Sequence, residues 1–218
     1  MKACVIVFPG SNCDKDIGSV LTEHWGITVE YVWHRNRIDK IDLVILPGGF
    51  SYGDYLRSGA MATFSPAMES VRDFARKGGK VLGICNGFQI LTEAHLLPGA
   101  LVSNLSLKYI CRDEDLLPVF HPNGFWKDSR KIPNLFRIPI AHGEGRYYAD
   151  PDTLKRLEEN GQIVFRYKNN PNGSLNDIAG ICSEKKNIIG MMPHPERAVN
   201  PFAGLMDGKV FFDYFLGM

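Results

Sequence analysis

The sequence predicts an α/β fold in which a mainly parallel, doubly wound sheet is flanked by helices and carries an added small β region. The first observation behind this prediction is that short apolar runs alternate with helical segments through the first half of the chain. The second is that three of these runs end in loops that contain glycine, after residues 8, 46 and 84. Ligands of such sheets bind beyond the carboxyl ends of the strands, so these loops should meet at a functional site.

The elements of the first half follow from local signals. The apolar run at 3–8 is continuous, as expected of a strand buried on both faces. A helix should follow over 14–25, where Gly26 provides a stop. The next helix is predicted between Ser65, which can cap its first turn, and the Gly78–Gly79 pair that ends it. The remaining elements expected here are strands at 28–33, 43–46 and 81–84, and a helix at 86–95.

The second half of the chain is less regular. Prolines interrupt the stretch 97–137, where we expect strands and loops packed on the main sheet. Further strands are expected at 163–167, 178–182 and 188–192, and helices at 152–159 and 209–216. No linker-like composition separates one part from another, so we expect a single domain that spans residues 1–218.

Composition excludes several classes of protein. The 218 residues carry a formal net charge of +1, which gives no electrostatic reason to expect nucleic acid or an anionic membrane as a partner. No apolar run approaches the roughly 20 residues of a membrane span, and the first apolar run is too short for an export signal, so we expect a cytoplasmic protein. The five cysteines are widely spaced without a CxxC pair. This spacing argues against a disulfide framework and a zinc site, and no metal is expected.

One cysteine has a context that points to chemistry. Gly83-Ile84-Cys85-Asn86-Gly87 has the form G-x-C-x-G at a predicted strand-to-helix junction, which is the cysteine version of a nucleophile elbow. Such a turn presents the sulfur at the edge of the sheet. The following helix start offers free N–H groups and positive potential, which favour the reactive thiolate. The alternative, a buried packing cysteine beside a tight turn, is weakened by the strand–turn–helix context.

A histidine and a glutamate near the end of the chain complete a possible triad. In Pro193-His194-Pro195-Glu196 the prolines push their preceding residues toward extended geometry. Side chains two apart then point the same way, so Glu196 can hold one ring nitrogen of His194 while the other faces a nucleophile. Taken alone, this motif is also compatible with a proline-stiffened surface turn. Its position after a predicted strand, together with the Cys85 elbow, favours catalysis.

Weaker signals lie elsewhere. Gly48 and Gly49 follow a buried strand and could bring backbone N–H groups to the rim of the site, although an ordinary glycine turn has the same pattern. Arg57 is most simply a solvated residue, with an interface as the alternative. Four scattered histidines are interpreted as surface or loop residues rather than metal ligands: His24, His34, His95 and His121.

Six stretches of the chain resemble class I, triad-type, glutamine amidotransferases. They are FPGSNCDKD, LPGGFSYGDYLRSGA, GICNGFQILTEAHLLPGAL, IPIAHGEGRYYAD, NPNGSLNDIAGI and GMMPHPERA, which span residues 8–198. The cysteine motif and HPE are specific to the broad family. SYGDYLRSG, AHGEGRYY and NGSLNDIAGI are similar to its purine-synthesis branch, the glutaminase subunits of phosphoribosylformylglycinamidine synthase. The stretch 113–135 departs from the family pattern, which leaves its role open.

The resemblance implies roles for individual residues. Cys85 would be the nucleophile, His194 the acid and base, and Glu196 its partner. The residues implied in oxyanion and substrate binding are Gly49, Asn86, Gln89, His142 and Gly143. The first two would donate backbone N–H bonds to the oxyanion, and Gln89 would contact the substrate glutamine. The loop that carries the last two would line the pocket or the ammonia exit.

The same resemblance implies partners. Ammonia from glutamine would pass to a separate ATP-dependent synthetase, which converts formylglycinamide ribonucleotide to the amidine, and a small bridging subunit is a further candidate partner. ATP and Mg²⁺ are expected on that synthetase, and no cofactor in this chain. Residues 204–210 only superficially match a P-loop, because three residues separate the glycines and no Ser or Thr follows the lysine.

Three alternatives stay open at this point. A cysteine hydrolase or peptidase on a similar sheet would also use an elbow cysteine, and the late HPE motif argues against it. A non-catalytic binding or regulatory subunit would need no intact triad. Within the family, ammonia could instead feed another pathway, such as guanine nucleotide or histidine synthesis, and only the flanking motifs speak for purine synthesis.

Overall fold

The chain divides into two compact units. The computed structural model describes residues 1–218, except for the side chain of Ala203. The first unit comprises 1–98 and 187–190, and the second comprises 99–186 and 191–218. No helix among the described residues combines the length and the apolar character that a membrane crossing needs.

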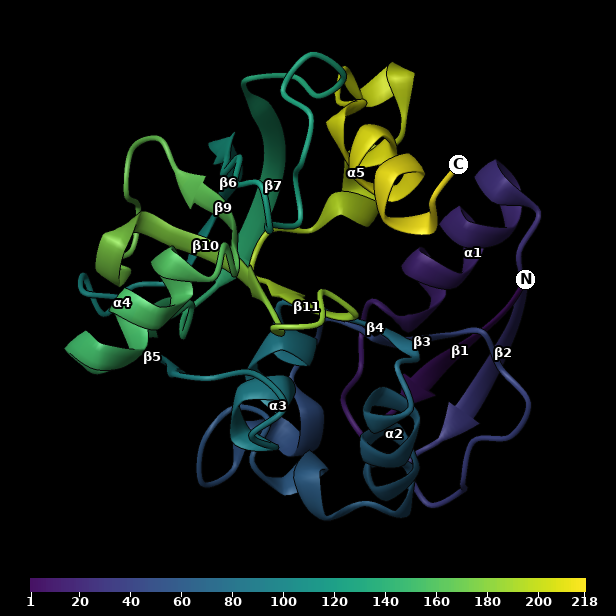
Figure 1. Ribbon diagram of the computed structural model, residues 1–218. Coiled ribbons are helices and arrows are strands. Elements are labelled where there is room, and N and C mark those ends of the chain that lie inside the picture. Colours follow the sequence, from purple (N-terminus) through teal and green to yellow (C-terminus); the bar gives the residue numbers. More distant parts are fainter. The chain divides into compact units, whose positions relative to one another are not determined.

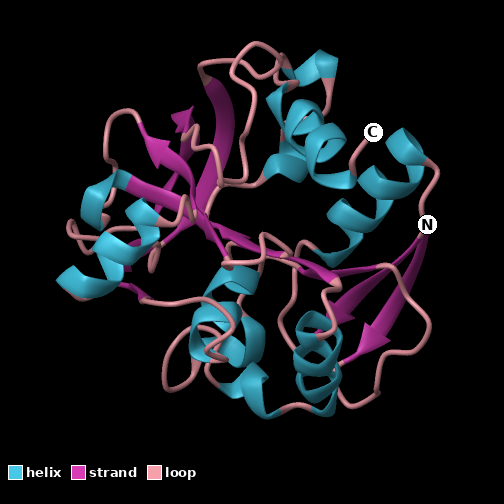
Figure 2. Cartoon of the chain, viewed as in Figure 1, coloured by secondary structure: helices cyan, strands magenta, loops and turns pink.

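The first unit is a doubly wound parallel sheet. The strands β1, β2, β3 and β4 pair in the order β2-β1-β3-β4, and every pairing between neighbours in this order is parallel. Figures 1 and 2 show helix α1 on one face of this sheet and helices α2 and α3 on the other. The bounds of its elements are β1 Lys2–Val7, α1 Asp14–Trp25, β2 Thr28–Trp33, β3 Leu43–Leu46, α2 Pro66–Arg76, β4 Lys80–Ile84, α3 Asn86–Glu93 and β11 Ile188–Met191. The predicted parallel, doubly wound sheet is confirmed here.

Local signals set the ends of these elements. Every residue of β3 is buried, because helices cover both faces of the sheet, and this explains its uninterrupted apolar run. The Ser65 hydroxyl accepts a hydrogen bond from the Met68 N–H and caps α2, as predicted. Helix α1 ends at Gly26, which adopts the left-handed conformation with φ 60°.

The second unit is mainly antiparallel. Four of its strands pair in the order β10-β9-β6-β7, and each of these pairings is antiparallel. A separate two-stranded sheet joins β5 and β8. The bounds are β5 Ala100–Val102, β6 Ile110–Pro118, β7 Phe136–His142, β8 Arg146–Tyr148, α4 Pro151–Glu159, β9 Ile163–Tyr167, β10 Ile178–Cys182 and α5 Asp207–Leu216. These strands confirm the added β region that the sequence predicts.

The core of the second unit is built around Trp126, which belongs to the stretch whose role the sequence left open. Its indole is fully buried, and Nε1 donates a hydrogen bond to the Val164 carbonyl at 2.9 Å. Its ring lies 5.5 Å from that of Phe136 and 5.4 Å from that of Phe165, centroid to centroid. The stretch 113–135 therefore supplies the central aromatic residue of this unit.

We predict that Trp126→Ala destabilises the chain by roughly 3–5 kcal/mol, because it leaves a large cavity and an unsatisfied carbonyl. Urea unfolding followed by far-UV circular dichroism measures this loss. Phe202→Ala is the matched control, because that ring is 99% exposed and its removal should change the unfolding free energy by less than about 0.5 kcal/mol. Equal effects of the two substitutions would contradict this account of the core.

Candidate active site

Cys85 sits at a strained turn between β4 and α3. Its backbone has φ 51° and ψ −106°, a conformation that a side-chain-bearing residue adopts only under constraint. Its carbonyl accepts hydrogen bonds from the N–H groups of Phe88 at 2.9 Å and Gln89 at 3.1 Å, which starts the helix. Its side chain is nearly buried, with the residue 6% exposed. This geometry confirms the predicted strand–turn–helix junction at Cys85.

The glycines on either side of the elbow allow two backbones to approach closely. A Cβ added at Gly87 would lie 1.9 Å from the Leu46 carbonyl oxygen, so α3 lies directly against the end of β3. A Cβ at Gly83 would lie 2.6 Å from the Gly87 carbonyl oxygen. Any larger residue at either position would push the helix away from the strands. The G-x-C-x-G pattern is therefore a packing requirement as well as a chemical motif.

The loop that carries Gly49 is held against the two other loops at this edge. The Phe50 N–H donates to the Gly10 carbonyl at 2.9 Å, and the Cys13 N–H donates to the Gly48 carbonyl at 3.2 Å. The Ser51 N–H donates to the side-chain oxygen of Asn86 at 3.1 Å. The loops after β1, β3 and β4 thus meet, as the sequence predicts.

The side chain of Asn86 was not anticipated as a contributor. Besides accepting from Ser51, it donates through Nδ2 to Oε1 of Gln89 at 2.8 Å, and the residue is almost fully buried. It therefore links the glycine loop to the first turn of α3. The sequence signal that could have revealed this role is the position of Asn86, a polar residue at the first position of a mainly apolar helix.

The segment after Gly49 is also more constrained than expected. The Tyr52 hydroxyl lies 2.7 Å from Nδ1 of His34, a residue that the sequence assigned to the surface or a loop. His34 is in fact buried against aromatic rings, and this burial lowers its pKa. The Arg57 guanidinium is 69% exposed, as expected of a solvated residue, and it donates through Nε to the Glu93 carboxylate of α3 at 2.9 Å.

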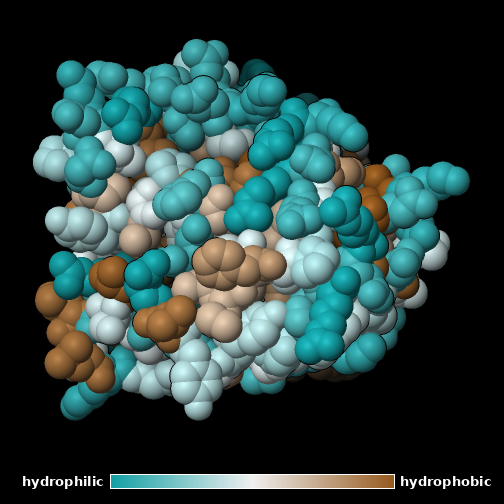
Figure 3. Space-filling model, turned by 90° about the horizontal axis from the view of Figure 1, so that it is seen from below, coloured by the Kyte–Doolittle hydropathy of each residue, from teal (hydrophilic) through white to brown (hydrophobic). Residues whose placement is uncertain are grey.

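Exposed apolar side chains lie on this segment. Figure 3 shows hydrophobic groups reaching the surface in several clusters on one face of the molecule. Within 50–64, Tyr55 is 76% exposed and Leu56 80% exposed, and Leu56 has a φ of 70°. The loop is thus tied to α3 from within while it presents apolar groups outward.

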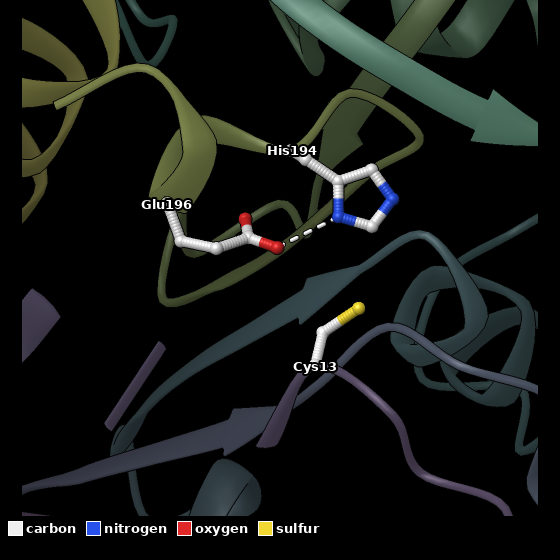
Figure 4. Close-up of side chains that lie close together, drawn as sticks. All are labelled: Cys13, His194 and Glu196. Carbon is white, nitrogen blue, oxygen red and sulfur yellow. Dashed lines mark hydrogen bonds and ion pairs between the residues drawn. The ribbon is translucent and has the colours of Figure 1, made fainter. Parts of the chain in front are cut away.

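In the second unit, His194 and Glu196 form the predicted pair. Oε1 of Glu196 lies 2.7 Å from Nδ1 of His194, and both residues are buried (Figure 4). Because a carboxylate only accepts, Nδ1 of His194 carries the hydrogen. The sequence predicts that the pair comes from an extended segment. Pro195–Arg197 instead forms a 3₁₀ turn after His194, and the two side chains meet across this turn.

The turn that carries this pair is anchored within the second unit. The His194 N–H donates to the Pro139 carbonyl of β7 at 2.8 Å. On its other side, the Gly208 N–H at the start of α5 donates to the Ala198 carbonyl at 2.8 Å. The imidazole is therefore fixed by a strand and a helix of the same unit.

His142, at the end of β7, is the second buried histidine of this unit. Its Nδ1 lies 3.1 Å from Oδ1 of Asn104, and the Asn104 N–H donates to the Gly143 carbonyl at 2.9 Å. Burial, and the charge of His194 after it, lower the pKa of His142 to about 4. His142 is therefore neutral at neutral pH.

The predicted site residues thus fall into two sets. The first unit holds Gly49, Cys85, Asn86 and Gln89 at the carboxyl edge of its parallel sheet. The second unit holds His142, Gly143, His194 and Glu196 at the end of β7 and in the turn anchored to that strand.

The low pKa of His142 predicts acid sensitivity. The unfolded chain binds a proton at this residue below about pH 6.5 and the folded chain only below about pH 4, so folding stability falls as the pH drops between these values. The loss should reach roughly 3 kcal/mol for this group. Urea unfolding at several pH values should therefore show a steeper decline in the unmodified protein than in His142→Gln. Parallel curves for the two proteins would refute this assignment.

Comparisons with known proteins identify the family of the chain. A family model for the CobB/CobQ-like glutamine amidotransferase domain matches residues 1–206. The phosphoribosylformylglycinamidine synthase subunit PurQ of Leptospira interrogans is 58% identical over 219 residues, which covers 100% of both chains. The corresponding subunit of Trichormus variabilis is 55% identical over 214 residues, with 97% of this chain and 95% of the relative covered.

Solved structures give the same result. A chain in a structure of PurLQS from Thermotoga maritima superposes with a TM-score of 0.88 at 43% identity, covering 99% of this chain and 97% of that one. A glutamine amidotransferase from Thermotoga maritima superposes with a TM-score of 0.62 at 15% identity and shares the fold, covering 99% of this chain and 96% of that one. The chain belongs to the CobB/CobQ-like glutamine amidotransferase family, and within it to the PurQ glutaminase subunits of phosphoribosylformylglycinamidine synthase.

Proposed function

We propose that this chain is a glutaminase subunit that hydrolyses glutamine to glutamate and ammonia through Cys85, His194 and Glu196. Its ammonia serves a synthetase that converts formylglycinamide ribonucleotide to formylglycinamidine ribonucleotide. The observation that carries the proposal is the strained Cys85 elbow in a chain 58% identical to a PurQ subunit. Support in the second unit comes from the buried His194–Glu196 pair. We also propose that residues 1–218 act as one domain.

The proposed reaction proceeds in two steps. The Cys85 thiolate attacks the carboxamide carbon of glutamine, and the negative charge that develops on the carbonyl oxygen is met by the backbone N–H groups of Gly49 and Asn86. When the C–N bond breaks, protonated His194 gives its Nε2 proton to the leaving nitrogen, and a glutamyl thioester and ammonia result. His194 then takes a proton from water, the hydroxide attacks the thioester, and glutamate and the thiolate are released.

Glu196 and Gln89 have supporting roles in this proposal. The Glu196 carboxylate fixes the Nδ1–H tautomer of His194 and stabilises the imidazolium that forms when Nε2 is protonated. Gln89 contacts the bound glutamine from the first turn of α3, where Asn86 orients its side chain. Gly143 and His142 border the path of the amide nitrogen.

The synthetase in this proposal is a separate ATP-dependent subunit, which holds ATP and Mg²⁺, and a small subunit bridges the two. Support comes from the structural neighbour at 43% identity, which is a chain in a structure of PurLQS. We place the assembly in the cytoplasm, as expected for purine synthesis. The pathway assignment rests on two PurQ subunits, which are 58% and 55% identical to this chain.

We predict that Cys85→Ala lowers glutamine-dependent synthesis by the assembled enzyme at least 1,000-fold, on the order expected for loss of a nucleophile. Synthesis from added ammonium should survive, because the synthetase does not need the thiol. Glutamate release and product formation measure the two activities in parallel. The control is Cys111→Ala, an exposed cysteine outside the proposed site. Glutamate release that persists in purified Cys85→Ala protein would contradict the assignment.

Glu196→Gln should lower the rate of glutamate release on the order of 10²- to 10⁴-fold, because an amide can present a donor to Nδ1 and favour the wrong tautomer of His194. The KM for glutamine should change little, since Glu196 orients the base and does not hold the substrate. Steady-state kinetics of the assembled enzyme separate the two parameters. An exposed carboxylate, Glu159, provides the control Glu159→Gln. An unchanged rate in Glu196→Gln would remove Glu196 from the triad.

A further inference from the structure

Asn104 is a fully buried amide with every hydrogen-bonding direction assigned by its surroundings. Its Nδ2 lies 2.8 Å from the Lys108 carbonyl oxygen and 2.9 Å from the His142 carbonyl oxygen. Carbonyls only accept, so the nitrogen of the side chain must face them. Oδ1 consequently faces Nδ1 of His142 and the Gly145 N–H, both at 3.1 Å.

This arrangement determines which nitrogen of His142 carries the hydrogen. Oδ1 of an amide is an acceptor, so Nδ1 of His142 donates to it. A neutral imidazole has one N–H, and Nε2 is therefore a bare acceptor. His142 stays neutral at about pH 7, because burial and the charge of His194 lower its pKa to about 4.

The ring is also held in place by Gly145. A Cβ added there would lie 2.3 Å from both Cε1 and Nδ1 of His142, so the glycine backbone packs against the imidazole. The Gly145 N–H shares Oδ1 of Asn104 with the ring. Rotation of the imidazole would therefore require the loop to move.

Nε2 of His142 has no hydrogen-bond partner among the described residues, although it is buried and the residue is only 3% exposed. A buried acceptor without a donor costs about 1–3 kcal/mol, so a group that supplies one during function is the simplest reason for its retention. His194 is anchored to the strand that ends at His142, because its N–H donates to the Pro139 carbonyl of β7 at 2.8 Å. The unsatisfied acceptor therefore lies at the end of the strand that holds the proposed acid of the reaction.

We propose that Asn104 is a positioning residue that holds His142 as the Nδ1–H tautomer, so that Nε2 accepts a hydrogen bond from the carboxamide nitrogen of glutamine and then from the ammonia it becomes. This inference rests on the proposed function. No covalent bond to His142 forms or breaks. When an N–H of the leaving nitrogen is held by an acceptor, the lone pair of that nitrogen is free to take the proton of His194. The other tautomer would present an N–H and repel the amide.

The first test compares two buried asparagines in the assembled enzyme. Asn172→Ala is the control for Asn104→Ala, because Asn172 is equally buried and donates to the Gly145 carbonyl at 2.9 Å but does not bond to the imidazole. We expect kcat/KM for glutamine to fall at least about 10-fold more in Asn104→Ala than in Asn172→Ala. Ammonium-dependent synthesis should be equal in both. Equal losses from glutamine would overturn the positioning role.

The second test needs no variant of Asn104. Nitrogen NMR of the histidine rings distinguishes the two tautomers, and loss of one signal in His142→Gln identifies His142. At about pH 7 the unmodified protein should show His142 as the Nδ1–H form, whereas Asn104→Ala should show a mixture. An Nε2–H form in the unmodified protein sinks the inference even if Asn104→Ala does not fold.

The two tests also separate this inference from the proposed function. If the unmodified assembly releases no glutamate from glutamine, the function fails, and the NMR result then concerns the tautomer alone. If glutamate is released but His142 is the Nε2–H form, the function stands and the role of Asn104 falls.

Discussion

The crossing of α3 over the ends of β3 and β4 is the contact on which the first unit depends. Two glycines leave no room there for even one added carbon, and the chain between them must reverse within a single residue. Cys85 takes the strained backbone that results, and α3 begins at the residue that follows it. The close packing of α3 against the strands therefore accounts for the strained backbone of Cys85, for the start of the helix and for the position of the thiol.

The two buried imidazoles of the second unit have hydrogen-bond partners of different charge. A carboxylate contacts Nδ1 of His194, and an amide contacts Nδ1 of His142. A negative partner stabilises an imidazolium, whereas a neutral amide in a buried setting leaves the ring uncharged. The same nitrogen is occupied in both rings. The difference in partner, together with the burial that lowers the pKa of His142, suits His194 to carrying a proton and His142 to accepting a hydrogen bond.

Much of the fold and of the site could be predicted because the signals are local. The elbow lies within five residues, and His194 and Glu196 are two apart, so motif and spacing found them. The Asn104–His142 bond joins residues 38 apart and depends on how the strands of the second unit bring their ends together. Trp126 likewise meets Val164 across 38 residues. Periodicity carries no information about such pairings, and the burial of His34 was missed for the same reason.

The loop after β3 is fastened to α3 at two places, through Ser51 to Asn86 and through Arg57 to Glu93. Between these fastenings stand Tyr55 and Leu56, both turned to solvent. The loop therefore holds both ends of the nucleophile helix, through Asn86 at its first residue and Glu93 at its last. Because Asn86 directly follows Cys85, the exposed loop is bonded to the residue next to the thiol.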